Sequence, residues 1–294
     1  DWFLIEAGFP FGGTLKYNDV VRNIYDALFE LNVECDFIPS DAPAERLAKY
    51  EMIVTPALYC TPQETTDRLR EFVSSGGHLV STMRSFVTDD EVTVWHDRAP
   101  HNLTDVFGMT YNQFTRQNGH VSVEFAGTLA KTPASDAQAL IELVTPFDGT
   151  DVLASYGHYA WKDYAAVTRH GFGKGDAEWI ATLLDADTIR AVLREAVEHA
   201  GIADAGTALA GQVTVRRGTN ARGEQVTYLL NYSADEVTID SPVSGDVVVA
   251  PVVVGTDGTV DESATAAIAL KEGSKVEVGD RLTIGRWNVV VIAG

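Results

Sequence analysis

The sequence predicts an α/β domain built on a parallel sheet, followed by a small domain made only of β-strands. Three observations predict this. Helical and strand-like hydrophobic patterns alternate from residue 14 to about residue 85, as in βαβ units. Beyond Ala203 the helical pattern ends, and short strand-like runs alternate with turn residues. The chain has 294 residues and 45% hydrophobic content, which is enough to bury the cores of two domains.

The first part of the α/β domain alternates predicted helices with predicted strands. Apolar residues recur at helical spacing over 16–31, and a strand is expected at 34–38. Thr61-Pro62-Gln63-Glu64 has the pattern of a capping box with proline at the first helical position, and Gly76-Gly77 should end that helix. The remaining predictions here are helices at 43–49 and 61–75 and strands at 52–54 and 78–82.

A long irregular excursion is expected over residues 86–120. Excursions of this length in a compact domain are usually functional or interfacial. The domain then continues with predicted strands at 121–125, 139–145, 165–169 and 179–182, and with a last helix over 186–200 that Gly201 ends. The run Gly171-Phe172-Gly173-Lys174-Gly175 lacks the spacing of a phosphate-binding loop and predicts a tight hairpin instead.

The domain boundary is expected between residues 203 and 210, giving an α/β domain over 1–205 and an antiparallel β-sandwich over 206–294. Turn signals in the second domain are Arg217-Gly218, Arg222-Gly223, Asp257-Gly258 and Gly279-Asp280. The aromatic residues of this domain are Tyr228, Tyr232 and Trp287. They form no aligned row, and we expect two of the three to lie in the core.

Charge and cysteine content exclude several functions. The 42 acidic and 22 basic residues give a formal net charge of −20, which repels nucleic acid and anionic lipid. No apolar run is long enough to span a bilayer, and residues 1–15 show no signal-peptide pattern. The two cysteines, Cys35 and Cys60, are too few for a disulfide framework and fit a reducing cytoplasm.

The histidines give no indication of a metal centre or a cofactor site. None of the seven stands in an HxH or HExxH spacing that would place two ligands on one face. His96 and His101, with Trp95, Asp97 and Arg98, form the densest cluster, which we interpret as loop structure or a subunit interface. We therefore expect no metal and no cofactor.

Five segments, in order, resemble the region that follows the catalytic barrel in glycoside hydrolase family 42 β-galactosidases. The resemblance covers about 200 residues, and a weaker one extends through 213–217, 229–231 and 281–292. The five segments are Asp1-Trp2, YNDVVR with YDAL at 17–28, YEMIVTPAL at 50–58, FVSSGGHLV at 72–80 and AVTRHGFGKG at 166–175.

This resemblance implies a trimerisation domain followed by a small C-terminal β-domain. In the family the acid/base and nucleophile glutamates lie on an N-terminal barrel, which nothing in this sequence resembles. The resemblance thus implies non-catalytic domains of a retaining β-galactosidase that hydrolyses terminal β-D-galactosides, inactive when alone. It also implies that the partner is the chain itself, in a homotrimer, and that a galactoside would be bound only through the barrel.

The trimerisation domain of the family is itself similar to class I glutamine amidotransferases, a flavodoxin-like fold with helices on both faces of its sheet. Their nucleophilic cysteine lies in a sharp turn, which here falls at Thr82-Met83-Arg84-Ser85 and contains no cysteine. Two alternatives stay open. One is a stand-alone amidotransferase-like protein without a nucleophile. The other is a carbohydrate-binding module, for which the candidate stacking residues are Trp95, Tyr156, Tyr159 and Trp161.

Residues 84–114 are predicted to contribute to the subunit interface. An acidic chain must keep like charges apart when it self-associates, and this segment supplies arginine and aromatic side chains. Arginine and tryptophan are enriched among the residues that dominate interfaces. The predicted contact residues are Arg84, Phe86, Trp95, His96 and Arg98.

Overall fold

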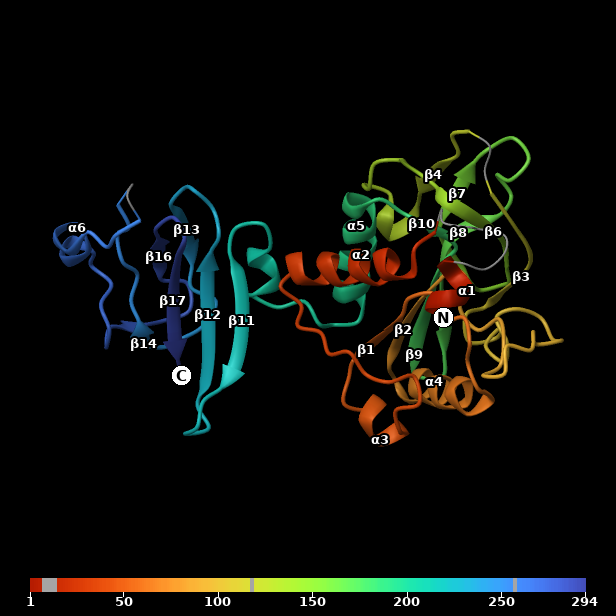
Figure 1. The fold of residues 1–294 in the computed structure, drawn as a ribbon, viewed down its shortest axis with the longest axis horizontal. Helices are drawn as coiled ribbons and strands as arrows, with labels where there is room; N and C mark the ends of the chain where they lie inside the picture. The colour runs from red at the N-terminus through yellow and green to blue at the C-terminus, as the bar shows by residue number, and fades with distance from the viewer. Residues whose placement is uncertain (7–14, 117–118, 256–257) are drawn as a thin grey trace. The chain divides into compact units, whose positions relative to one another are not determined.

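The computed structural model describes residues 1–6, 15–116, 119–255 and 258–294 of the chain (Figure 1). It divides into two compact units. The first comprises Asp1–Ala27 and Asp36–Ile202, and the second comprises Leu28–Cys35 and Ala203–Gly294. The first unit is mixed α/β and the second is almost entirely β, which confirms the coarse fold class predicted from the sequence.

The sheet of the first unit is mixed rather than parallel. Three strands are parallel, β1 (Met52–Thr55), β2 (His78–Thr82) and β9 (Gly175–Ile180). A short hairpin joins β8 (Ala165–Phe172) to β9, and a hairpin can join only antiparallel strands. The order β1-β2-β9-β8 continues antiparallel through β7 (Asp151–Gly157), β4 (Ser122–Phe125) and β5 (Ser135–Asp136), while β6 (Gln138–Pro146) pairs with β8, β3 (Met109–Thr115) and β10 (Thr182–Leu183).

Helices lie on both faces of this sheet (Figure 1). On one face, α4 (Gln63–Ser75) buries Phe72 and Val73 against Leu79 and Trp179. On the other, α2 (Tyr17–Glu30) and α5 (Ala186–His199) lie over β2 and β9. The remaining helices of the unit are α1 (Trp2–Glu6), α3 (Ala44–Leu47) and the 3-10 turn η1 (Gly127–Leu129).

One predicted element differs from the structure. The segment 34–38 forms no strand, and Phe37 is 70% exposed. The chain start is helical from Trp2 to Glu6, and Ala7 lies outside the described residues.

The predicted capping box at the start of α4 is wrong. Pro62 occupies the cap position, and no side chain caps the helix. The Thr61 hydroxyl instead donates to the Leu58 carbonyl at 3.0 Å, and the Thr61 amide donates to the Thr88 carbonyl at 2.8 Å. Thr61 is fully buried, so its hydroxyl stabilises the preceding turn and is not available to the helix amides.

Alternation along β2 places chemically different residues on its two sides. Leu79 packs in the apolar core beneath α4. His78 and Thr82 point to the opposite face, toward α2 and α5, because side chains alternate along a strand. In β9, Asp176 is in register with His78, and Glu178 is in register with Val80. The face beneath α5 is therefore partly polar.

The second unit is a β-sandwich. Its larger sheet has the order β11 (Thr214–Thr219), β12 (Gln225–Asn231), β17 (Asn288–Ala293), β14 (Gly245–Val249) and β15 (Lys275–Val276). A second sheet pairs β13 (Val237–Asp240) with β16 (Arg281–Ile284). Inward-facing residues of both sheets form one core, including Val215, Leu229, Ile239, Ile284 and Val290. The unit also contains η2 (Thr207–Leu209) and α6 (Glu262–Ala267).

The residues that follow α2 belong to this second unit through Asn32. Its Nδ2 donates to the carbonyls of Gly206 and Val213, both at 3.0 Å, and its Oδ1 accepts from the Val215 amide at 2.9 Å. Asn32 is 3% exposed and has a φ of 60°, a left-handed conformation that asparagine tolerates. Leu28–Cys35 is thereby joined to a sheet that begins far along the sequence.

Several details predicted for the second unit are corrected. Arg217-Gly218 lies inside β11 and is not a turn, whereas Arg222-Gly223 and Gly279-Asp280 do lie between strands. Asp257 lies outside the described residues. All three aromatic residues are exposed, at 42% for Tyr228, 59% for Tyr232 and 63% for Trp287, so none of them forms the core. A carbohydrate-binding role for this unit stays a prediction.

Candidate functional site: the elbow after β2 and the segment that follows it

The turn that follows β2 adopts a backbone conformation that is unusual for its residues. Arg84 has a φ of 64° and Phe86 a φ of 60°, and Ala57, which follows β1, has a φ of 47°. A left-handed conformation costs a residue with a side chain about 1–2 kcal/mol. Hydrogen bonds hold the turn: the Ala57 amide donates to Thr82 Oγ1 at 2.8 Å, and Ser85 Oγ accepts from the Leu58 amide at 3.0 Å.

Glu142 of β6 lies buried beneath this elbow. Its Oε1 accepts from the Arg84 amide at 2.9 Å, and its Oε2 accepts from Trp179 Nε1 at 3.0 Å. Burial raises the pKa of Glu142 to about 7, although the nearby Arg84 charge and these hydrogen bonds oppose the rise. The carboxyl group therefore fixes the elbow and changes charge near neutral pH.

The Arg84 side chain lies between aromatic rings. Its guanidinium carbon is 4.1 Å from the centre of the Phe114 ring and 5.1 Å from that of Tyr59. One guanidinium nitrogen donates to the Tyr59 hydroxyl at 3.3 Å. Arg84 is only 5% exposed. The elbow after β2 thus holds a buried cation against π faces.

The segment after the elbow is anchored in the core before it reaches the surface. Phe86 is 1% exposed and packs against Phe107 and Trp179, with ring centres 6.2 and 6.3 Å away. Thr88 forms a parallel bridge with Cys60. This anchoring makes the outer part of the excursion a rigid projection from the sheet.

The outer part is closed by a stacked pair. The rings of Trp95 and His101 are 3.7 Å apart and nearly parallel, at 6°. His101 also contacts Asp97 through Nδ1 and Gln63 through Nε2, both at 2.8 Å. Although burial acts in the opposite direction, the hydrogen bonds from His101 and the Asn102 amide lower the pKa of Asp97.

The predicted interface residues fall into two groups. Arg84 and Phe86 are buried and support the segment from inside, and Trp95 is half-buried against His101. His96 and Arg98 are exposed. Sequence reasoning missed Val92 and Val94, which are 49% and 64% exposed. We define residues 91–98 as the tip. The sequence signal that could have identified them is a pair of valines within a largely polar segment.

Sequence reasoning also missed Glu142. An acidic residue within the otherwise apolar strand pattern of 139–145 was the signal that could have identified it. Tyr156, listed among candidate sugar-stacking residues, is 1% exposed and donates its hydroxyl to the Glu142 carbonyl, so it stacks on no sugar. Trp161 stacks on His158 with ring centres 4.1 Å apart, and Tyr159, although 88% exposed, has its ring centre 4.5 Å from that of His158.

Cys60, the GFGKG run and Asp89 have structural roles. Cys60 lies outside the elbow, and its sulfur accepts from the Thr88 hydroxyl at 3.3 Å. The GFGKG run forms the predicted hairpin between β8 and β9, with Phe172 paired to Gly175 and a φ of 64° at Gly173. Asp89 accepts the amides of Glu91 and Thr93 at 3.0 and 2.8 Å, which shapes the start of the tip.

Comparison with known proteins identifies the larger unit. Residues 1–203 match the family described as the β-galactosidase trimerisation domain, which is more than half of the chain. The chain belongs to this family. The resemblance to glycoside hydrolase family 42 β-galactosidases found in the sequence is therefore confirmed, and the matched region is a non-catalytic part of such enzymes.

Relatives of the trimerisation domain are considerably longer proteins. β-Galactosidase BgaA of Planococcus sp. is 28% identical over 231 residues, covering 77% of this chain and 33% of that protein. The β-galactosidase structure from Rahnella sp. R3 superposes with a TM-score of 0.74 at 22% identity, over 95% of this chain and 37% of that one. Gan42B, a GH42 β-galactosidase from G. stearothermophilus, gives a TM-score of 0.71 at 19% identity, over 97% and 37%. The chain spans about a third of the length of its relatives.

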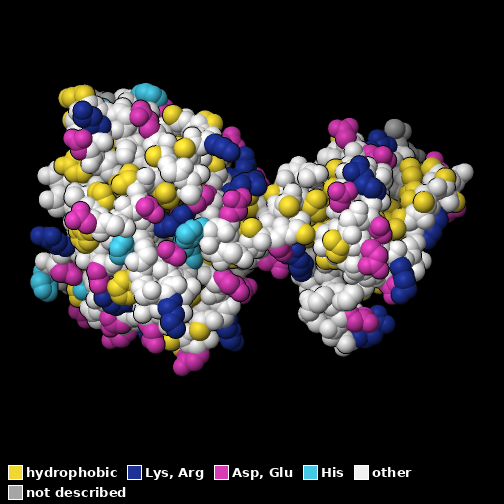
Figure 2. Space-filling view, turned by 180° about the vertical axis from the view of Figure 1, so that it is seen from behind, with side chains coloured by type: hydrophobic (Ala, Val, Ile, Leu, Met, Phe, Trp, Pro, Cys, Tyr) yellow, Lys and Arg dark blue, Asp and Glu magenta, His cyan; other side chains and the backbone are white. Residues whose placement is uncertain are grey.

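On the face drawn in Figure 2, acidic side chains are spread over both units, with lysine and arginine side chains among them. This distribution agrees with the formal charge of −20. No helix among the described residues is both long and apolar enough to cross a membrane.

Proposed function

We propose that this chain holds together the subunits of a β-galactosidase as a homotrimer and carries none of its catalytic residues. The observation that supports the proposal most strongly is the match of residues 1–203 to the trimerisation domain family. The substrate of the whole enzyme would be a terminal β-D-galactoside, bound outside this chain. The amidotransferase-like comparison is also a proposal, supported by the left-handed turn at Arg84 after a parallel strand.

An activity measurement tests the non-catalytic part of the proposal. The purified chain, incubated with a chromogenic β-galactoside, should give no turnover above buffer. The family resemblance places the paired carboxylates of glycoside hydrolysis on the barrel, outside this chain, and Glu142 is fully buried. Turnover that survives further purification and is lost in Glu142→Gln would contradict the proposal.

We further propose that the tip, residues 91–98, contacts a neighbouring subunit. It combines exposed Val92 and Val94 with exposed His96 and Arg98, on a segment that the buried Phe86 and the Trp95–His101 stack hold rigid. Rigid, partly apolar projections lose little conformational freedom on association. Arg98 can pair with a carboxylate of the neighbouring subunit, while Glu91 and Asp97 leave the tip without net positive charge.

A matched pair of variants tests the tip. Val94 is 64% exposed in the tip, and Val278 is 65% exposed in the β-sandwich unit. Val94→Asp should weaken trimer formation at least about tenfold, the effect of about 1.4 kcal/mol, because a carboxylate would be desolvated at the contact. Val278→Asp should leave it unchanged. If sedimentation shows that the two variants form equally stable trimers, the tip is not part of the interface.

The cellular location also remains a proposal. The two cysteines are free thiols, Cys35 exposed and Cys60 half-buried, which supports a reducing compartment such as the cytoplasm.

A further inference from the structure

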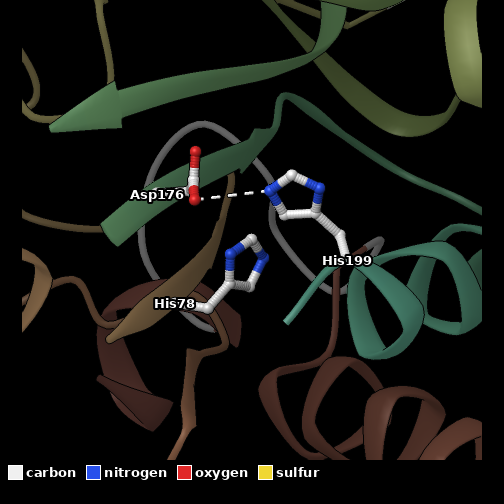
Figure 3. Close-up of side chains that lie close together, drawn as sticks. All are labelled: His78, Asp176 and His199. Carbon is white, nitrogen blue, oxygen red and sulfur yellow. Dashed lines mark ion pairs between the residues drawn. The ribbon is translucent and has the colours of Figure 1, made fainter. Parts of the chain in front are cut away.

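Three potential metal ligands converge at the opposite end of β2 from the elbow. His78 is the first residue of β2, Asp176 lies beside it in β9, and His199 is the last residue of α5. The parallel register pairs His78 directly with Asp176, so both side chains point to the face that α5 covers. Figure 3 shows the two imidazoles and the carboxylate pointing toward one another.

The separations are close to those of ligands on a single ion. One ligand atom from each residue lies within 4.8 Å of the others. Asp176 Oδ2 and His199 Nε2 are 3.3 Å apart. Two ligand atoms bound tetrahedrally at about 2.1 Å from zinc are separated by about 3.4 Å. The separations within the set therefore exceed the tetrahedral value by at most about 1.4 Å.

His78 is a buried polar group without a hydrogen bond in the described part of the chain. It is 4% exposed, and neither ring nitrogen has a hydrogen-bond partner there. Nε2 does lie 3.0 Å from Glu178 Oε1, but the contact is out of line for a hydrogen bond and is electrostatic only. Buried polar atoms almost always have a hydrogen-bond partner, so an imidazole without one that faces two further ligand atoms has the geometry expected at a metal site.

The charge around the three residues also favours a cation. Asp176, Glu178 and Glu195 contribute three carboxylates on this face, and Glu178 Oε2 is buried without a partner among the described residues. Arg169 is the guanidinium that compensates them. Its Nη2 is 2.8 Å from Glu178 Oε1 and also pairs with Glu195. With one guanidinium facing three carboxylates, this face has an excess of negative charge that a divalent cation would neutralise.

We propose that His78, Asp176 and His199 bind a divalent transition-metal ion such as Zn²⁺, Co²⁺ or Ni²⁺. Imidazole nitrogens favour these ions over Mg²⁺ and Ca²⁺, which prefer oxygen ligands. Glu178 lies 3.0 Å from His78 Nε2, so a small rotation of the ring on metal binding would let this carboxylate accept a hydrogen bond and orient the histidine. The ion would join β2, β9 and the end of α5, three elements that are far apart in sequence.

Binding requires one local change. Arg169 Nη1 lies 3.3 Å from His199 Nδ1, and a histidine that binds through Nε2 carries its proton on Nδ1. The two donors would then face each other, so this long contact must open. The competing arrangement without metal is the cluster seen in the structure, in which His78 lies beside Glu178 and His199 beside Asp176.

Calorimetric titration of the whole chain with Zn²⁺, together with the visible absorption of added Co²⁺, tests the proposal. One ion per chain should bind, and the absorption should be that of nitrogen and oxygen ligation. Asp176→Asn and His199→Gln, both at half-exposed positions, should each lower the affinity at least about tenfold. His120→Ala removes an exposed His–Asp pair with Asp136 and should leave the affinity unchanged.

Thermal denaturation with and without Zn²⁺ provides the second readout. The metal should raise the midpoint of the natural chain and of His120→Ala, but not that of Asp176→Asn. Circular dichroism without metal establishes that each variant is folded, and if His78→Gln does not fold, the two half-exposed variants decide. No binding by the natural chain, or binding equally strong in Asp176→Asn and His199→Gln, would overturn the proposal and leave an ion-pair cluster.

Discussion

Glu142 is the residue on which the elbow after β2 depends. It accepts the amide of Arg84, whose φ of 64° is otherwise unfavourable, and it accepts Trp179 Nε1 from the centre of the core. A carboxylate in this position satisfies donors that a hydrophobic side chain would leave unpaired. Its burial is also the reason why its charge state changes within the neutral pH range.

The raised pKa of Glu142 makes a prediction about pH and stability. The pKa is about 7 in the folded chain against an ordinary value of 4.5, so the folded state binds this proton more tightly than the unfolded state. The resulting stability is fully present below the ordinary pKa and is lost as pH rises through about 7. The free energy of unfolding should fall by about 3 kcal/mol across this window.

Glu142→Gln should remove this part of the pH dependence. Urea denaturation at a series of pH values measures it, and Glu71→Gln, at an exposed position of α4, serves as the matched control. Because the natural chain and Glu142→Gln share every other titrating group, the difference between their curves of unfolding free energy against pH isolates Glu142. Parallel curves for the natural chain and Glu142→Gln would show that the carboxyl group is charged, or neutral, throughout.

At the level of elements, β2 links the two proposed sites of the first unit, because one lies at each of its ends. Its carboxyl end leads into the elbow and the tip, and its amino end carries His78 beside Asp176. Between the two ends, Leu79 packs beneath α4 and fixes the strand in the core. The strand thus positions both the proposed assembly segment and the proposed metal ligands.

Asn32 has the corresponding role in the second unit, which leads to a prediction. Asn32→Ala removes hydrogen bonds to Gly206, Val213 and Val215 and retains the left-handed backbone. We expect a loss of about 1.5–4 kcal/mol in the free energy of unfolding. Asn32→Gly should lose about 1 kcal/mol less, because glycine adopts this φ without strain. Denaturation curves for both variants that coincide with the natural curve would contradict this assignment.

The elements that the sequence predicts well are those defined by local periodicity. The helices over 17–30, 63–75 and 186–199 and the strands at β1 and β2 agree closely with hydrophobic spacing. Apart from the hairpin at 171–175, the antiparallel half of the sheet was not predicted, because strand direction depends on pairing between distant segments. The 34–38 segment has strand propensity but does not pair with β1, the strand at the end of the sheet order.

The candidate sites were less predictable than the fold for a related reason. Arg84 and Phe86 were identified by residue type, but their burial depends on Glu142 and Phe107, which belong to distant segments. His78, Asp176 and His199 stand on three separate elements, so no spacing rule brings them together. The capping box at Thr61 failed because a competing hydrogen bond to Leu58 lies in the preceding turn.

For the whole molecule, the central claim is self-association of an acidic chain through its trimerisation domain. Three copies with a formal charge of −20 each repel one another, so the contacts must offset this repulsion, and added salt should strengthen assembly by screening it. The exposed valines of the tip provide apolar area for such a contact, and Arg98 provides a compensating charge.

The molar mass of the 294-residue chain in solution tests this claim most directly. Multi-angle light scattering across a dilution series, in low and in moderate salt, should give a species with three times the 31.8 kDa mass of the chain at high concentration. This species should dissociate on dilution and persist to lower concentration in moderate salt. A mass of one chain at every concentration and in both salts would contradict the account.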